Sequence, residues 1–179
     1  MSSSKETAVF GGGCFWCTEA IFTRVRGVLS VTSGYAGGTI VNPNYEEVST
    51  STTGHAEVIK IEFDPKVISY AELLDIFWHV HDPTTLNQQG ADMGTQYRSI
   101  ILTTSDEQQK KALASKKALD ESHEYKNPVV TNIRPLDKFY TAEEYHKNYF
   151  EKHESQPYCE LVIAPKIKKF LEKYGDKAK

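Results

Sequence analysis

Hydrophobic residues occur at two different spacings along the chain, and these spacings predict both strands and helices. Short runs of apolar or alternating residues predict four strands, at 7–10, 28–35, 55–63 and 97–103. Apolar residues three and four apart, together with capping residues, predict five helices, at 14–25, 69–81, 105–122, 141–153 and 165–174. The segment 84–96 shows neither spacing, and a loop of this length in a compact domain often carries function.

The order of these elements indicates a fold. Strand, helix, strand, strand, helix, strand over 7–103 is the split βαβ order of ferredoxin-like domains. We therefore expect an α+β protein, a ferredoxin-like two-layer α/β sandwich with a helical and irregular C-terminal extension. No repeat or linker divides the chain, so residues 1–179 are expected to form a single domain. Its core would cover about 7–136 and its extension about 137–179.

Composition and charge exclude several classes of protein. Hydrophobic residues make up 39% of the chain and charged residues 25%, as in ordinary globular proteins. A net charge of -3 argues against nucleic acid or an anionic membrane as a partner. No apolar run approaches the roughly 18 residues that span a bilayer. The first residues lack the hydrophobic region of a signal peptide, so we expect a cytoplasmic protein.

The three cysteines point to chemistry rather than to a disulfide framework. Their number is odd, and clustered cysteines in a reducing compartment are usually catalytic, redox-active or metal-binding. Cys14 and Cys17 have the Cys-x-x-Cys spacing of dithiol redox motifs. A zinc site would need further ligands nearby, but Cys159 is distant in sequence and the histidines form no paired motif. We therefore expect no metal.

Cys14 follows three glycines at the predicted start of a helix. There its sulfur would lie near unpaired backbone N–H groups and the positive end of the helix dipole, which favour the nucleophilic thiolate. Glycines let the backbone approach a neighbour or substrate closely. The alternative is a buried structural cysteine, a common fate for this residue. We favour the reactive thiol.

Glu57 lies in the clearest predicted strand and shares a face with three hydrophobic residues, Ile59, Ile61 and Phe63. A carboxylate on a core face is costly unless it is paired. One interpretation is a strand-edge glutamate that is bonded to the backbone or to a basic residue. The other is a desolvated carboxyl group with a raised pKa, able to donate a proton near neutral pH.

Several tyrosines and the long loop offer further polar groups. Tyr45 lies in a loop rich in proline and asparagine, and Tyr97 leads out of the loop that contains Asp92. A phenol can donate a hydrogen bond to a developing oxyanion. Taken singly, each of these tyrosines, like Tyr35 at the end of the second strand, fits core packing equally well. Cys159 lies in a loop-like segment between two helical stretches and matters only if Cys14 is oxidised during turnover.

Several motifs together resemble the peptide methionine sulfoxide reductase A family across nearly the whole chain. They occur in the family's order: GGGCFWCTE, SGYAGG, NPNYEEV, TGHAEVIKIEFDP, FWHVHDPTTLNQQGADMGTQYRS and HKNYF…PYC. The resemblance implies a ferredoxin-like core and a thiol enzyme that reduces the S-epimer of methionine sulfoxide, free or in proteins, as repair after oxidative damage. It also implies recycling by thioredoxin and no cofactor. Nothing in the sequence indicates more than a monomer.

The resemblance assigns roles to individual positions. Cys14 matches the nucleophile, and Phe15 and Trp16 match the pocket for the substrate methyl group. Glu57 matches the acid catalyst.

Three further positions match residues around the substrate. Tyr45 and Tyr97 match tyrosines that help to hold the sulfoxide oxygen. Asp92 matches an aspartate of the binding pocket, which would act through water.

Two cysteines compete for the role of the resolving thiol. Cys159 matches a recycling cysteine of the family, whereas many members carry glycine where this chain has Cys17. A disulfide requires Cα atoms within about 7 Å, which a mobile segment can reach, so we favour Cys159. A relay through both cysteines is also open.

Two other classes of function remain as alternatives. A thioredoxin-like oxidoreductase would use the Cys-x-x-Cys pair on protein disulfides and would not need Glu57. A zinc-binding or scaffold module would need more ligands than the chain offers. The glycine runs fit neither a Walker nor a Rossmann phosphate loop, so no nucleotide or flavin is expected.

Overall fold

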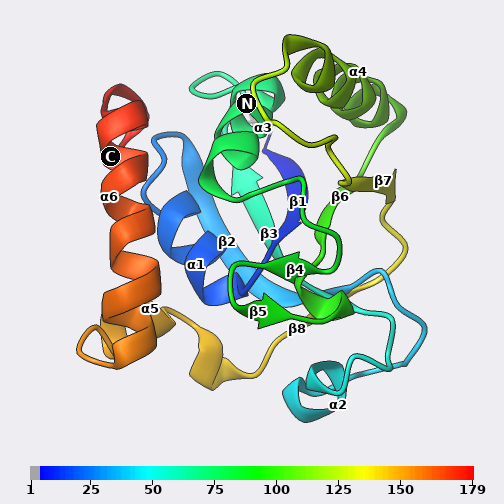
Figure 1. Cartoon of the computed structure of the whole chain (residues 1–179), viewed down its shortest axis with the longest axis vertical. Helices are drawn as coiled ribbons and strands as arrows, with labels where there is room; N and C mark the ends of the chain where they lie inside the picture. Colours follow the sequence, from blue (N-terminus) through cyan, green and yellow to red (C-terminus); the bar gives the residue numbers. More distant parts are fainter. Residues whose placement is uncertain (1–4) are drawn as a thin grey trace.

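A mixed six-stranded sheet runs through the centre of the protein (Figure 1). The structure is a computed structural model and describes residues 5–179. Across the sheet the strands follow the order β7 (Asn132–Pro135), β6 (Ser99–Thr103), β1 (Glu6–Gly12), β3 (Ala56–Phe63), β2 (Val28–Ala36) and β8 (Phe139–Thr141). Only β6 and β7 pair in parallel, and every other neighbouring pair is antiparallel. The fold is therefore α+β, as predicted.

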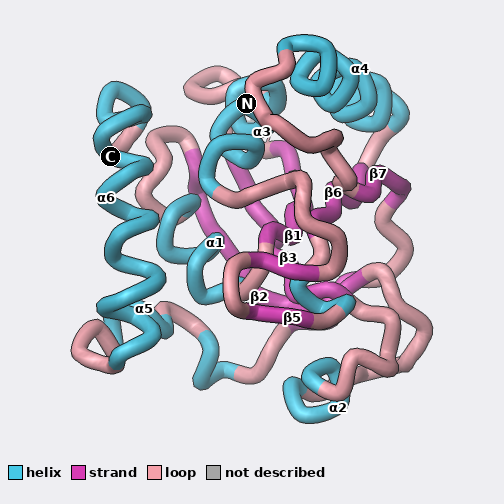
Figure 2. The backbone as a smooth tube through the Cα atoms, viewed as in Figure 1, coloured by secondary structure: helices cyan, strands magenta, loops and turns pink. Residues whose placement is uncertain are grey.

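Within residues 5–179 the chain forms six α-helices (Figure 2). They are α1 (Phe15–Phe22), α2 (Tyr45–Ser49), α3 (Tyr70–Val80), α4 (Asp106–Ser122), α5 (Tyr149–Lys152) and α6 (Ala164–Tyr174), of which α1 and α3 pack against the central strands. The predicted caps are confirmed, because the side chains of Ser69 and Ser105 accept N–H bonds at the starts of α3 and α4. No helix among the described residues is long and apolar enough to cross a membrane.

The strand β3 contributes to a hydrophobic cluster on each of its faces. Ile59, Ile61 and Phe63 belong to the large core under the helices α1 and α3. Val58 belongs to a smaller cluster on the opposite face of the sheet. Because β3 lies between β1 and β2 near the middle of the sheet, its face toward α1 and α3 is closed to solvent, and the Glu57 side chain is buried there with the larger core. On the other face Lys60 and Glu62 are only partly buried.

The C-terminal part corrects the predicted extension at several points. The helix expected at 141–153 is wrong: Phe139–Thr141 forms the edge strand β8, and only Glu144–His146 and Tyr149–Lys152 are helical. Asn148 has a left-handed φ of 52°, which interrupts a continuous helix. The extension thus completes the sheet through β8. Its last helix, α6, lies beside α1 (Figure 1).

Three segments expected to be loops contain local structure. Residues 45–49 form α2, whose start is closed by a reciprocal capping box between Asn44 and Glu47. The loop 84–96 contains a small hairpin of β4 (Gln88–Gln89) and β5 (Asp92–Met93). Cys159 begins a π-helical turn, Cys159–Ile163, that runs directly into α6 and buries the thiol completely.

Candidate active site

The strand β1 delivers Cys14 to the first turn of α1. Gly13 has a φ of +96°, and a Cβ at this position would come to 2.7 Å from the Gln89 side chain, so only glycine fits. Cys14 is the N-cap of α1, and its carbonyl oxygen accepts the Cys17 N–H at 3.0 Å. The Cys14 side chain is 8% exposed, so the sulfur lies just beneath the surface.

Glu57 lies against this helix start. Its Oε1 accepts the backbone N–H of Phe15 at 3.1 Å, while Oε2 is buried without a hydrogen-bond partner. Burial raises the pKa of Glu57 to about 8, the Phe15 N–H offsets part of this rise, and the nearby negative charge of Asp92 adds to it. The carboxyl group is therefore mostly protonated at neutral pH. Glu57 thus combines a feature of each interpretation, because it accepts a backbone N–H and its burial raises its pKa.

Tyr45 and Tyr97 approach the same place from two separate segments. Burial raises the pKa of Tyr45 to about 12 and raises that of Tyr97, and the charges of Glu57 and Cys14 raise both further. Both phenols therefore stay protonated and can donate hydrogen bonds near neutral pH. The chain folds so that Tyr45 is anchored by Glu143, whose Oε2 accepts the Tyr45 N–H at 2.9 Å.

Phe15 and Trp16 belong to an aromatic cluster above the thiols. The Trp16 ring stacks on Tyr149 with 3.6 Å between centroids and 4° between planes, and Tyr158 meets its edge. The Trp16 Nε1–H donates to His146 Nδ1 at 3.0 Å. Burial lowers the pKa of His146, so its imidazole is neutral, which keeps Nδ1 free to accept.

Asp92 is linked to the thiols through a tyrosine. The Tyr158 hydroxyl donates to Asp92 Oδ2 at 2.7 Å and lies 3.8 Å from Cys17 Sγ. Tyr158 precedes Cys159 in the chain, so this contact holds the start of the π-helical turn against the hairpin that carries Asp92.

The protonation of the thiols differs from the sequence-based expectation. Burial, together with a hydrogen bond to Cys17, raises the pKa of Cys14 well above its usual value. The same hydrogen bond lowers the pKa of Cys17 to about 7. The helix start therefore does not by itself make Cys14 a thiolate, because desolvation outweighs it.

The structure thus brings together nearly all of the residues that the sequence singles out. Cys14, Glu57, Tyr45 and Tyr97 affect one another's titration, and Asp92 joins them through Tyr158. Cys159 is completely buried. Its burial raises the pKa of its thiol, and the negative charge of a Cys17 thiolate raises it further. All three cysteines are free thiols.

Sequence reasoning missed three aromatic partners and one carboxylate. These are His146, Tyr149, Tyr158 and Glu143. The density of aromatic residues at 145–158 is a usable signal, although the helical pattern there suggests an ordinary amphipathic helix. A continuous helix over 141–153 would not indicate that the rings of His146 and Tyr149 both contact Trp16.

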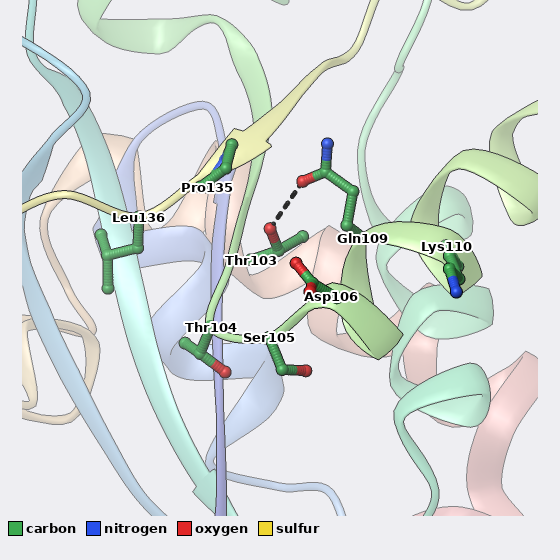
Figure 3. Close-up of a pocket in the computed structure, with 8 residues that line it drawn as sticks. All are labelled: Thr103, Thr104, Ser105, Asp106, Gln109, Lys110, Pro135 and Leu136. Carbon is green, nitrogen blue, oxygen red and sulfur yellow. Dashed lines mark hydrogen bonds between the residues drawn. The ribbon is translucent and has the colours of Figure 1, made fainter.

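Two other features do not compete with this site. A pocket of about 630 Å³ lies between the end of β6 and the start of α4, where Thr103 donates to Gln109 (Figure 3). Because Gly12 pairs with Ser99, at the other end of β6, this pocket lies at the opposite end of the strands from Cys14. Among residues 5–179, no group of three or more His, Cys, Asp or Glu side chains is arranged to hold a metal ion.

Comparison with known sequences identifies similar proteins over the whole described chain. The family model described as peptide methionine sulfoxide reductase matches residues 6–179. The peptide methionine sulfoxide reductase MsrA of Saccharolobus solfataricus is 54% identical over 174 residues, which are 97% of both chains. The MsrA of Sulfolobus acidocaldarius is 57% identical over 173 residues, again 97% of both chains.

Solved structures agree with this similarity. Reduced Mxr1 from Saccharomyces cerevisiae has a TM-score of 0.80 and 34% identity, covering 89% of this chain and 91% of that one. Methionine sulfoxide reductase A of Corynebacterium diphtheriae has a TM-score of 0.82 and 32% identity, covering 87% and 78%. Mxr1 in complex with Trx2 has a TM-score of 0.57 and 25% identity, covering 83% and 87%.

Proposed function

Because the chain belongs to the peptide methionine sulfoxide reductase family, as an MsrA enzyme, we propose that Cys14 attacks the sulfoxide sulfur while Glu57 protonates its oxygen. The observation that carries this proposal is the neutral Glu57 carboxyl group, whose unpartnered Oε2 is buried beside the start of α1. A sulfoxide oxygen is a poor leaving group until it is protonated, so the acid and the thiol must act together.

The reaction balances with these groups alone. The Cys14 sulfur bonds to the sulfoxide sulfur as Glu57 donates a proton to the oxygen, and Tyr45 and Tyr97 hydrogen-bond that oxygen. Collapse transfers the hydroxyl group to Cys14, which leaves methionine and a Cys14 sulfenic acid. The thiol is oxidised by two electrons and the sulfoxide is reduced by two. The Cys14 proton restores Glu57.

The aromatic cluster defines where the methyl group lies. Phe15 and Trp16 would form an apolar wall that accepts the methyl group and excludes water, with Trp16 held by Tyr149 and His146. The methyl group would then face the aromatic wall, the oxygen would face Glu57 and the two tyrosines, and the sulfur would face Cys14. Such a site discriminates between the two epimers, and we assign it to the S-epimer on the resemblance of its motifs.

We propose that the sulfenic acid is resolved through both remaining cysteines in turn. Cys17 lies one helical turn from Cys14, and its lowered pKa supplies a thiolate for the first condensation, which releases water. Cys159 is affected by the charge of Cys17 and is buried in a helical turn rather than in a mobile loop. Exchange onto Cys17–Cys159 would then free Cys14 for another turnover.

Rapid alkylation and peptide mapping after one turnover test this order. We expect a Cys14–Cys17 disulfide first and a Cys17–Cys159 disulfide afterwards. In Cys159→Ser the first disulfide should accumulate, and its reduction by thioredoxin should slow. A direct Cys14–Cys159 disulfide at the earliest times, with no Cys14–Cys17 species, would rule out the relay and leave Cys159 as the sole resolving thiol.

A thioredoxin is the reductant that we propose for the final disulfide. The structural neighbour Mxr1 was solved in complex with Trx2, which supports this assignment. Thiol–disulfide exchange transfers two electrons and two protons from the dithiol to the enzyme disulfide. It leaves two thiols on the enzyme and a disulfide on the reductant. The need for a dithiol reductant and the three free thiols support a cytoplasmic location.

The same proposal extends to the architecture. The central strands β6, β1, β3 and β2 are neighbours in that order and pair antiparallel, with α1 between β1 and β2 and α3 between β3 and β6. This arrangement supports a ferredoxin-like split βαβ core, to which β7 and β8 add one strand at each edge. We also propose that the chain is a single catalytic domain and works as a monomer.

A further inference from the structure

A groove beside the candidate active site has no role in the mechanism proposed above. It has a volume of about 320 Å³ and lies between the β4–β5 hairpin and the start of α6. Its lining residues are Gln89, Gly90, Ala91, Asp92, Tyr158, Leu161, Val162, Pro165, Lys166 and Lys169. The volume is near the lower end of the range for ligand sites, which suits a short piece of polypeptide.

The groove adjoins the thiols through two of its lining residues, Tyr158 and Gln89. Asp92 and Tyr158 line it, and the Tyr158 hydroxyl lies 3.8 Å from Cys17 Sγ. Gln89 lines it as well and packs against the backbone of Gly13, immediately before Cys14. A residue adjacent in sequence to a bound methionine sulfoxide would therefore enter this groove.

One wall of the groove is apolar and exposed. Leu161 is 74% exposed, a large unpartnered side chain next to the site, and Val162 and Pro165 continue the same wall. Beyond it the groove becomes cationic at Lys166 and Lys169. Neither lysine forms an ion pair within residues 5–179, whereas several other lysines of the chain do.

The carboxylate of Asp92 forms no ion pair with either lysine of this cationic end among residues 5–179. Its Oδ2 already accepts the Tyr158 hydroxyl at 2.7 Å, at the end of the groove nearest the thiols. One end of the groove, nearest the thiols, thus carries the carboxylate of Asp92. The other end, along α6, carries the ammonium groups of Lys166 and Lys169. A polypeptide that matches this pattern carries negative charge a short distance from its oxidised methionine.

We propose that this groove binds the polypeptide flanking the methionine sulfoxide, and that Lys166 and Lys169 select protein substrates with acidic residues there. The spacing supports two contacts, because lysines three apart on a helix have Cβ atoms about 5–6 Å apart. Alternate residues of an extended peptide share a face and lie about 6.6 Å apart. Glutamates two and four residues from the methionine sulfoxide match that spacing.

Synthetic peptides test this inference, which rests on the proposed function. Each carries one methionine sulfoxide, with glutamate, glutamine or lysine two and four residues before it or after it. The second-order rate constant for reduction is measured under single-turnover conditions with the reduced enzyme at 0.15 M salt. Each value is divided by the value for the blocked amino acid N-acetyl methionine sulfoxide methylamide with the same enzyme. Either before or after the methionine sulfoxide, glutamate should give a rate constant about fivefold higher than glutamine at the same positions. Two partly exposed ion pairs allow a difference of this size.

Charge reversal on α6 identifies the groove as the source of the preference. In Lys169→Glu the preference should disappear, because Lys166 still attracts an acidic peptide while the new carboxylate repels it, so the glutamate and lysine peptides should be reduced at similar rates. Lys169 is preferred to Lys166 for this test, because the Lys166 charge also lowers the pKa of Cys17, after the hydrogen bond from Cys14. Lys168→Glu is the matched control, since Lys168 is exposed on the same helix but does not line the groove.

Four results would overturn the inference. Equal rates for all peptides would leave the reductase activity intact and remove the acidic preference. A loss of the preference in Lys168→Glu as large as in Lys169→Glu would assign the preference to the general charge of the helix. If Lys169→Glu slowed only recycling by thioredoxin, the groove would serve the reductant instead. A failure to reduce even the blocked amino acid would refute the proposed function itself, and the inference with it.

Discussion

Replacing Cys14 with serine is expected to abolish methionine sulfoxide reduction while leaving the fold intact. A serine hydroxyl in the same place is not ionised at any accessible pH and is a poor nucleophile toward sulfur. Steady-state turnover should fall by at least about four orders of magnitude, to the background of the assay. Because serine is a favoured N-cap residue, the free energy of unfolding in urea should change by no more than about 1 kcal/mol.

Cys17→Ser is the control for this variant, because Cys17 lies one helical turn away and is also buried. It should complete its first turnover and then recycle slowly. Activity retained in Cys14→Ser, or a first turnover lost only in Cys17→Ser, would transfer the nucleophile's role to Cys17.

Replacing Glu57 with glutamine is expected to slow the reductive step about 100- to 1000-fold, within the range of general acid catalysis. Glutamine retains an oxygen that can accept the Phe15 N–H, so the start of α1 should keep its position. It has no proton of suitable pKa to transfer. The measurement is the single-turnover release of methionine from the reduced enzyme.

The pH dependence of the same step separates proton transfer from simple loss of fit. In the native enzyme the rate should rise with pH as Cys14 ionises and level off near pH 8, where Glu57 loses its proton. In Glu57→Gln the rise should continue above pH 8, because only the Cys14 ionisation remains. Glu62→Gln, on the same strand but paired with Lys5 at the surface, should behave like the native enzyme. A profile that levels off near pH 8 in Glu57→Gln would mean that another group is the acid.

The elements of the core are predictable from the sequence because their signals are local. Ser69 and Ser105 are capping residues followed by long helical patterns, and both helices begin where expected. The alternation of residues over β3 is enough to place Glu57 on the core face, where its side chain is buried. Its contact with Phe15, forty-two positions away, depends on tertiary packing and has no local signal.

The C-terminal segment is less predictable for the same physical reason. The helical pattern over 141–153 gives no sign of the backbone reversal at Asn148 or of the pairing of β8 with β2. The pattern therefore places His146 and Tyr149 on one continuous helix, although the structure turns both rings toward Trp16. The protonation of Cys14 also depends on burial, which a helix start cannot reveal.

The most direct test of the account is to trap the first oxidised form of Cys14. The double variant Cys17→Ser, Cys159→Ser keeps the nucleophile and removes both resolving thiols. When it is mixed with one equivalent of methionine S-sulfoxide and dimedone, we expect one methionine per enzyme and a dimedone adduct on the peptide that contains Cys14. Methionine released without an adduct on Cys14, or no methionine at all, would contradict the account.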